Sequence, residues 1–313
     1  MKKTLVGLMV LAASGAAFAQ SAVTVYGTAD LAIAKANGGG KVQMTGNDVS
    51  NNGNSRIGFK GTEDLGSGLK ASFVLEAGVN LEDGSTNASL FQRAANMSLS
   101  GDFGEVKVGR GLSLGHASAA VYDVTGLANY STVGNSFGLV GGTRNNSELR
   151  YTSPEVAPGL KLAVGYVLAE DNLVGAKAAN GSSPAVDGVA TSKMDLAAMY
   201  ANGPIFASAV FSKPTDGEKS YALGGGYSFG TYKVAASYQD PAGMGKGFTV
   251  GAAAEFGSAA VAIDIARDTE LKATNYVAEG KYSLSKRTSA YAAYQRFGAT
   301  STSVVSAGVR HNF

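Results

Sequence analysis

A pattern with a period of two residues recurs along most of this chain, and it constrains the fold more than any other feature. Near the N-terminal end, Val23, Val25 and Ile33 lie on one face of such a stretch, whereas Thr28 and Asp30 lie on the other. Successive side chains of a β-strand point to opposite faces, so alternation of apolar and polar residues predicts a strand with one apolar and one polar face. The chain is therefore expected to be all-β.

Sixteen stretches of this kind can be counted, separated in alternation by short turn signals and longer polar stretches rich in Gly, Asn and Ser. An even number of antiparallel strands with tight turns at one rim and long loops at the other is typical of a transmembrane β-barrel, and about sixteen strands enclose an aqueous channel. A soluble β-sandwich would have about seven to nine strands in a domain of about 100 residues, and this sequence shows no domain boundary. The predicted strands cover residues 22–34, 55–63, 68–80, 91–101, 104–111, 146–153, 159–168, 193–201, 205–213, 219–229, 231–240, 246–256, 259–268, 273–284, 288–297 and 302–313.

The composition agrees with a barrel. Only 16% of the residues are charged, yet residues 20–313 contain no apolar run approaching the roughly 20 residues that a membrane-spanning helix needs. Strands that alternate lipid-facing and lumen-facing side chains produce this mildly hydrophobic average. The small number of prolines, 6, suits long hydrogen-bonded ladders, and the absence of cysteine excludes disulfides and thiolate metal sites.

The first 19 residues have the pattern of a secretory signal peptide. Lys2 and Lys3 precede an apolar stretch of about ten residues, and Ala-Phe-Ala at 17–19 is the small-x-small pattern of a cleavage site. We expect residues 1–19 to be removed and residues 20–313 to form the barrel. Without these two lysines, the 26 Lys and Arg fall to the number of the 24 Asp and Glu, so the mature chain is neutral and gives no reason to expect nucleic-acid binding.

The last predicted strand ends the chain on an aromatic residue. Val305, Val309 and Phe313 lie on one face of this strand, whereas Arg310 lies on the other. A terminal Phe that closes an alternating strand resembles the signal that outer-membrane barrels present to the barrel assembly machinery. Together with the export signal, it predicts a protein embedded in the lipid of a Gram-negative outer membrane.

Several segments resemble the general trimeric porins of beta-proteobacteria and of the neisserial type. They occur in order over most of the mature chain: SRIGFKGTEDLGSGLK from Ser55, LSGDFGEVKVGR from Leu99, NSELRYTSP from Asn146, YANGP from Tyr200 and VRHNF at the end. The resemblance implies a homotrimer of sixteen-stranded barrels, each with a third long loop folded into the lumen. It also implies passive diffusion of small hydrophilic solutes and ions through a water-filled pore.

One long segment is the candidate for that loop. Residues 111–143 lack clean alternation, and loops of this length are uncommon unless they are functional. A plain surface loop remains the alternative. By resemblance, Arg56, Arg110 and Arg150 match the basic cluster on the barrel wall at the constriction, and Lys60 shares the face of Arg56. Arg110 is in phase with apolar neighbours, so a local bulge is needed to turn it inward.

Few acidic residues are candidates to face these cations. The loop carries one carboxylate, Asp123, and Asp30 and Glu76 lie on lumen-facing positions of predicted strands. Asp30 and Glu76 either pair with the wall cations of the pore or form ion pairs without a role in selectivity. Because basic groups attract counter-ions at a constriction, the excess of cations predicts mild anion selectivity.

Other classes of function find less support. The chain has only two histidines, His116 and His311, so a Ser-His catalytic arrangement could use only the one in the long loop, and an enzyme is not expected. No phosphate-binding glycine motif opens a helix, and we expect no metal and no cofactor. A substrate-selective channel would need an aromatic track, but Tyr26 and Tyr291 are isolated. An adhesion barrel would need recognition loops, but residues 171–192 contain no aromatic side chain.

Overall fold

The computed structural model describes residues 23–38, 40–86, 89–169, 191–243 and 245–313. The predicted signal peptide lies outside these residues. No helix in the described part of the chain is long and apolar enough to cross a membrane. The elements are β1 (Val23–Ala36), β2 (Gln43–Thr45), β3 (Arg56–Gly66), β4 (Leu69–Gly78), β5 (Ala94–Gly101), β6 (Gly104–Leu112), α2 (Leu114–Tyr122), α3 (Thr132–Phe137), β7 (Arg144–Thr152), β8 (Leu160–Val167), β9 (Lys193–Asn202), β10 (Ile205–Pro214), β11 (Ser220–Phe229), β12 (Tyr232–Asp240), β13 (Gly247–Phe256), β14 (Ala259–Asp268), β15 (Thr274–Ser283), β16 (Thr288–Phe297) and β17 (Thr302–Asn312).

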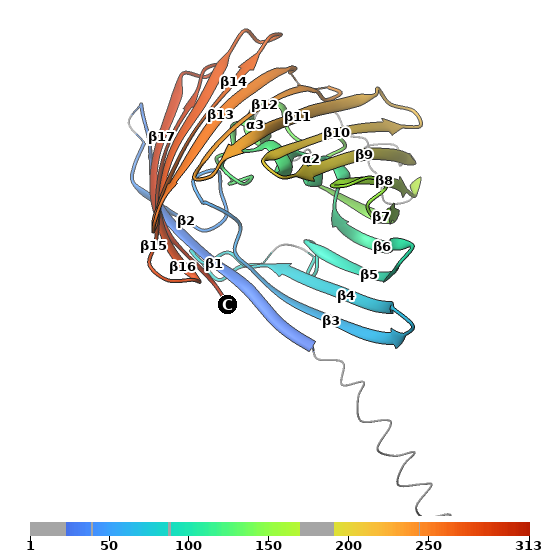
Figure 1. Cartoon of the computed structure of the whole chain (residues 1–313). Coiled ribbons are helices and arrows are strands. Elements are labelled where there is room, and N and C mark those ends of the chain that lie inside the picture. The colour runs from blue at the N-terminus through green and yellow to red at the C-terminus, as the bar shows by residue number, and fades with distance from the viewer. Residues whose placement is uncertain (1–22, 39, 87–88, 170–190, 244) are drawn as a thin grey trace, which may run out of the picture.

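All strands except the three-residue β2 form one closed antiparallel barrel of sixteen strands (Figure 1). Each pairs with its neighbours in the sequence, and β1 closes the ring by pairing with β17 on one side and β3 on the other. The backbones of Gly27 and Phe313 exchange hydrogen bonds of 2.9 and 3.1 Å, which extend the closing ladder to the last residue. A Cβ atom on Gly27 would lie 2.3 Å from the Phe313 ring, so this glycine makes room for the terminal aromatic.

The period-two pattern is confirmed as the pattern of a barrel wall. Val23, Val25 and Ile33 are more than half exposed on the outside of the barrel, whereas Thr28 and Asp30 are buried on the inside. Each of the sixteen predicted stretches overlaps one strand of the barrel. The short β2, which pairs with β1 beyond the end of β3, was not predicted, because three residues are too few to show a period.

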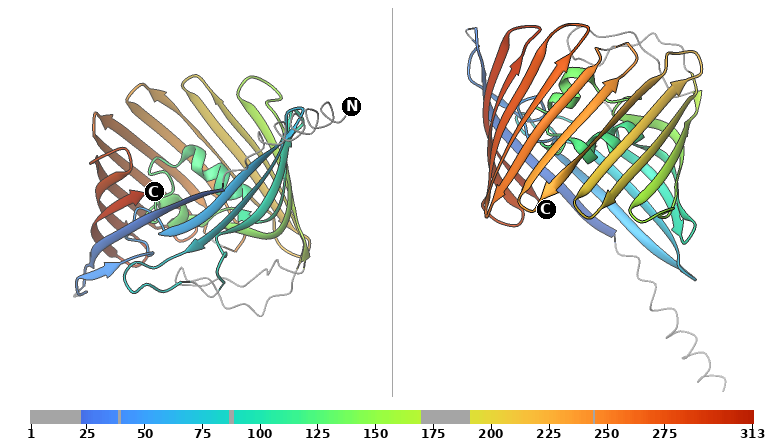
Figure 2. Two further views of the ribbon diagram at one scale, coloured as in Figure 1. Left: turned by 90° about the horizontal axis from the view of Figure 1, so that it is seen from below. Right: turned by 45° about the horizontal axis from the view of Figure 1, so that its top comes forward.

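The long segment after β6 folds into the barrel, as predicted. This segment, residues 113–143, is called loop 3 below. Its helix α2 packs against β9, β10 and β11, and its helix α3 packs against β13, β14 and β15. Figure 2 shows both helices inside the ring of strands from two further directions. A second segment, residues 46–55 between β2 and β3, is called loop 1.

The apolar core lies between loop 3 and the inner wall. Leu114 and Val140 of loop 3 pack against a set of small wall residues, Ala163, Ala197 and Ala222. Small side chains at these inward positions leave room for a helix against the strands, because packed interiors leave few voids. The same wall therefore holds loop 3 in place through burial of apolar surface.

Side-chain caps define both helices of loop 3. Ser113 accepts a hydrogen bond from the His116 backbone N–H at 3.0 Å, and Ser131 accepts one from the Gly134 N–H at 3.3 Å. These bonds satisfy N–H groups that the first turn of a helix leaves without a partner.

Candidate pore constriction

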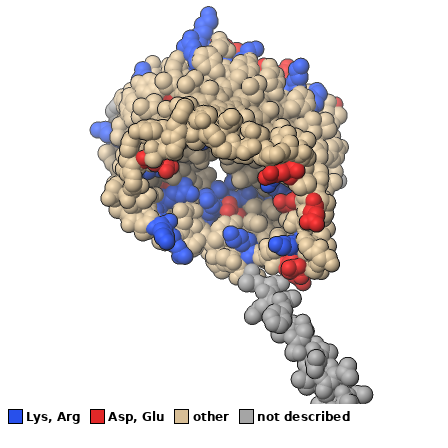
Figure 3. All heavy atoms as spheres, in the orientation of Figure 1, with Lys and Arg blue, Asp and Glu red and all other residues tan. Residues whose placement is uncertain are grey.

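A cavity of about 660 Å³ lies inside the barrel between loop 3, loop 1 and the wall on the side of β3 to β7. Figure 3 looks into the barrel and shows Lys and Arg atoms gathered around the opening, with fewer Asp and Glu atoms between them. The ionisable side chains that line the cavity are Asp48, Arg56, Glu76, Arg93, His116, Arg144 and Arg310. Four guanidinium groups thus face two carboxylates.

One carboxylate, Glu76, lies between two of the arginines. Its side chain is 2.8 Å from Arg93 Nε and 3.5 Å from Arg56 Nε. The Tyr26 hydroxyl also donates a hydrogen bond of 2.9 Å to it. Glu76 therefore compensates part of the positive charge of Arg56 and Arg93, and this group of three ionised side chains keeps a net charge of one cation.

The other two arginines are held by neutral partners. Arg144 Nε donates to the backbone oxygen of Arg93 at 2.9 Å, and Arg310 donates to the Asn52 side-chain oxygen at 2.9 Å. Among the described residues, no carboxylate lies within 4 Å of either guanidinium. Arg144 and Arg310 therefore supply positive charge without a carboxylate in direct contact among the described residues.

The loop 3 side of the cavity is uncharged at neutral pH. It presents backbone and neutral side chains such as Leu127, Asn129 and Asn135, and loop 3 contains no Lys or Arg. Burial lowers the pKa of His116 to about 4, and the charges of Arg144 and Arg93 act in the same direction. His116 is therefore a neutral imidazole near pH 7.

The carboxylate of loop 3 does not face the cavity, so the expectation for Asp123 was wrong. Asp123 is buried and accepts hydrogen bonds from the Thr125 N–H at 2.8 Å, the Thr125 hydroxyl at 2.6 Å and the Leu127 N–H at 3.1 Å. Its second oxygen accepts from the Ser131 hydroxyl. Asp123 therefore shapes the turn after α2, and loop 3 presents no carboxylate to the cavity.

Asp30 is a fully buried anchor for loop 1, and it does not line the cavity. Its carboxylate accepts from the Tyr291 hydroxyl at 2.6 Å, the Asn51 amide at 3.1 Å and the Gly53 N–H at 2.9 Å. The sequence left two alternatives open for Asp30, pairing with a cation of the pore wall or an ion pair without a role in selectivity. The structure shows neither, because the hydrogen-bond partners of Asp30 among the described residues are all neutral donors in a buried network.

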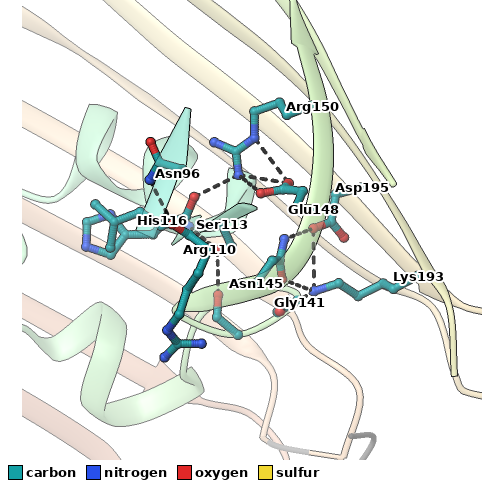
Figure 4. A network of polar contacts seen from close by, with 12 residues as sticks. Asn96, Arg110, Ser113, His116, Gly141, Asn145, Glu148, Arg150, Lys193 and Asp195 are labelled. Atoms are coloured by element: carbon teal, nitrogen blue, oxygen red, sulfur yellow. Dashed lines mark hydrogen bonds and ion pairs between the residues drawn. The ribbon is translucent and has the colours of Figure 1, made fainter. Parts of the chain in front are cut away.

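Arg150 lies on the inner wall but is buried away from the cavity. Its guanidinium is 2.7 Å from a carboxylate oxygen of Glu148 and donates to the backbone oxygen of Leu112 at 2.7 Å (Figure 4). The side chain is only 8% exposed. A buried cation that is already paired adds little to the potential of a pore.

The remaining two predicted cations are not among the residues that line the cavity either. β6 and β7 shift register between Gly109 and Gly111, where the sequence required a bulge, but the Arg110 guanidinium donates to the Gln92 backbone oxygen and to Asn146. Lys60 is exposed and lies four residues after Arg56 on β3, toward the turn at Gly66. The two residues are therefore roughly 13 Å apart along the strand.

Three cavity arginines were missed by sequence reasoning. Arg310 was placed on the inner face of the last strand, but strand alternation gives no height along the barrel axis. Arg93 and Arg144 lie at or just before the first residue of a strand, where the period-two pattern does not apply. The signal that could have found Arg93 and Arg144 is their position at the start of a strand. Arg93 directly precedes β5, and Arg144 is the first residue of β7, which follows loop 3.

A closed barrel of sixteen strands with an inserted loop and a polar, charged cavity is a membrane channel. A family model described as Gram-negative porin matches residues 5–302. The chain belongs to this family, and it is a pore-forming protein of the outer membrane.

The most similar curated relatives include two porins that match over most of this chain. Outer membrane porin protein 32 of Delftia acidovorans is 35% identical over 255 residues, which cover 76% of this chain and 69% of that protein. An outer membrane porin of Bordetella pertussis is 29% identical with the same coverage. Major outer membrane protein P.IB of Neisseria meningitidis serogroup A is 34% identical over 55% of this chain and 51% of its own.

Solved porin structures have the same architecture. An anion-selective porin from Comamonas acidovorans superposes with a TM-score of 0.74 at 26% identity, covering 94% of this chain and all of that one. A mutant of the Rh. blastica porin superposes with a TM-score of 0.68 at 17% identity, covering 93% of this chain and all of its own, which shows the fold alone.

Proposed function

We propose that this porin passes small anions in preference to cations, and that Arg56, Arg93, Arg144 and Arg310 set the preference. The observation that carries the proposal is the composition of the cavity, in which four guanidinium groups face two carboxylates and an uncharged loop. Two of these guanidiniums have no carboxylate partner among the described residues. An anion that passes between the wall and loop 3 meets fixed positive charge in this cavity.

The expected ion preference depends on where the charges lie in the pore and not on the net charge of the chain. The mature chain is formally neutral once the expected signal peptide is removed, so selectivity depends on where the charges lie. Two unit charges about 4 Å apart interact by about 1 kcal/mol in water and by about 4 kcal/mol at an effective dielectric constant of 20. A narrow pore lies between these limits, so a few unpaired arginines suffice for a preference of several-fold.

The comparisons support this direction of selectivity. The structure from Comamonas acidovorans is described as an anion-selective porin, and it is 26% identical to this chain.

We further propose that the porin forms a homotrimer, that residues 1–19 are cleaved on export, and that Phe313 is recognised by the barrel assembly machinery. We propose that the pore acts by passive diffusion and carries out no catalytic reaction.

Reversal potentials across a planar bilayer with a tenfold KCl gradient test the selectivity. Wild-type pores should give the sign of chloride preference, and the double substitution Arg144→Gln/Arg310→Gln should move the potential strongly toward zero. Lys286→Gln, which removes an exposed lysine from a turn between β15 and β16, is the control and should change little. A cation preference in the wild type, or no shift in the double variant, would contradict the proposal.

A further inference from the structure

Three ion pairs on the inner wall share one geometry. In each, an acidic and a basic residue stand two positions apart on one strand, so both side chains point to the inside of the barrel. The pairs are Glu148 with Arg150 on β7, Lys193 with Asp195 on β9, and Glu279 with Lys281 on β15, with distances of 2.7, 3.5 and 2.8 Å.

In two of these pairs, the cation also binds a backbone oxygen at an end of loop 3. Arg150 donates to the oxygen of Leu112, the residue that precedes the loop, at 2.7 Å. Lys193 donates to the oxygen of Gly141, near the end of the loop, at 2.5 Å. Figure 4 shows Arg150 beside Glu148, and Lys193 beside Gly141 and Asn145.

The site around Lys193 is closely packed. The ammonium group also donates to the Asn145 side chain at 2.6 Å, and Asp195 accepts from the Ser212 hydroxyl at 2.6 Å. A Cβ atom on Gly141 would lie 2.8 Å from the Ser212 oxygen and 3.1 Å from the Lys193 nitrogen. Loop 3 thus approaches the wall so closely here that a larger residue would displace the Ser212 hydroxyl, and the φ of +70° also favours glycine.

The third pair holds the middle of the loop. Lys281 donates to the backbone oxygen of Thr125 at 3.3 Å, in the turn between α2 and α3. Its partner Glu279 lies 2.8 Å away. The residue that precedes loop 3, the middle of the loop and its end are therefore each bound by a wall cation whose charge a carboxylate compensates.

We propose that Arg150, Lys193 and Lys281 are positioning residues that fix loop 3 against the wall and so set the width of the pore. A cation makes a stronger bond to a carbonyl than a neutral donor does, and its paired carboxylate keeps that cation from adding to the potential of the pore. Width and ion selectivity are therefore controlled by separate sets of basic residues. The four cavity arginines control selectivity, and the three paired cations control the position of the loop.

The substitution Lys193→Met/Asp195→Asn tests the proposal without changing the net charge of the lumen. Losing one charge-assisted hydrogen bond should raise the population of displaced loop states about tenfold or more. We expect larger open-channel current noise and faster entry of a trisaccharide relative to a monosaccharide in liposome swelling. The matched control is Lys246→Met/Glu270→Gln, which removes an exposed ion pair of 3.3 Å outside the strands and should leave both readouts unchanged.

A test from the loop side uses two neighbouring glycines with the same backbone conformation. Gly141 and Gly142 have φ of +70° and +87°, but a Cβ on Gly142 would meet no described atom within 4 Å. Gly141→Ala should therefore raise noise and trisaccharide entry, whereas Gly142→Ala, which carries a similar backbone strain, should not. This pair decides the question if the Lys193 variant does not form channels.

A reversible lock separates loop position from general loss of stability. The hydroxyl oxygens of Ser118 on α2 and Ser208 on β10 are 2.9 Å apart, and the chain has no natural cysteine. Adding Ser118→Cys/Ser208→Cys to the Lys193 variant should restore wild-type noise when oxidised and lose this rescue on reduction. Wild-type noise and sugar entry in both the Lys193 variant and Gly141→Ala would overturn the proposal, as would a disulfide that forms without rescue.

Discussion

Replacing Asp123 should release the turn of loop 3 that joins its two helices. The carboxylate accepts hydrogen bonds from two backbone N–H groups, those of Thr125 and Leu127, and from two hydroxyl groups. Asp123→Ala removes all four bonds and leaves the buried Thr125 N–H and the partly buried Leu127 N–H without this acceptor. Asp123→Asn keeps an oxygen for the N–H groups but loses the charge and the oxygen that accepts from the Ser131 hydroxyl.

The magnitude follows from these bonds. A buried donor left without an acceptor costs about 1–3 kcal/mol, so Asp123→Ala should destabilise the turn by roughly 4 kcal/mol. That free energy corresponds to about a thousandfold increase in the open population of the turn. Hydroxyl groups can rotate to other partners and add little. Asp123→Asn should cost about 1 kcal/mol, because neutral hydrogen bonds are weaker than charge-assisted ones.

Amide hydrogen exchange in detergent measures this opening directly. The Thr125 and Leu127 amides should exchange at least about a hundredfold faster in Asp123→Ala than in the wild type and less than about tenfold faster in Asp123→Asn. Amides of β12 and β13, on the wall, should be unchanged in both variants. Unchanged exchange in Asp123→Ala, together with a reversal potential shifted toward stronger anion preference, would refute the reasoning, because that result is expected of a carboxylate that faces the pore.

Three shorter predictions concern other parts of the structure. Burial holds the pKa of His116 at about 4, below its value in the unfolded chain, so the stability that the neutral imidazole contributes should fall as pH drops from about 6.5 to 4. The added charge below pH 4 should raise anion preference. His116→Gln should lack both effects when thermal unfolding and reversal potential are measured in parallel. Asp30→Asn should lower the free energy of unfolding by about 2–4 kcal/mol and Tyr291→Phe by about 1 kcal/mol, measured by denaturation in detergent; equal effects would contradict the central role of the carboxylate among its three donors. Gly27→Ala should slow refolding and reduce the yield of closed barrel on gels, because the Cβ atom would lie 2.3 Å from the Phe313 ring and 2.5 Å from the Arg56 backbone oxygen; a normal yield would contradict this steric role of Gly27.

The strands could be predicted from sequence because the barrel wall obeys one local rule. Lipid outside and water inside force apolar and polar residues to alternate, as at Val23, Thr24 and Val25, and this rule needs no knowledge of distant contacts. The helices of loop 3 could not be found in this way. α2 is nine residues long and is held by burial of Leu114 and Tyr122 against the wall, which the local sequence does not reveal.

The candidate site was only partly predictable. Arg56 and Glu76 were found because alternation places them inside the barrel, and the structure brings them together. Alternation also placed Arg150 inside, but it could not show that Glu148 pairs with it and that it binds the base of loop 3. Asp123 was taken for a pore residue because the sequence shows its charge and not the turn that buries it.

Anomalous diffraction from crystals grown in rubidium bromide tests the central claim most directly, because it locates each kind of ion inside the pore. The claim is that anions gather between loop 3 and the wall arginines. Bromide peaks should appear within hydrogen-bond reach of Arg144 and Arg310, and rubidium should be absent from this cavity. Rubidium in the cavity, with bromide found only outside it, would contradict the account.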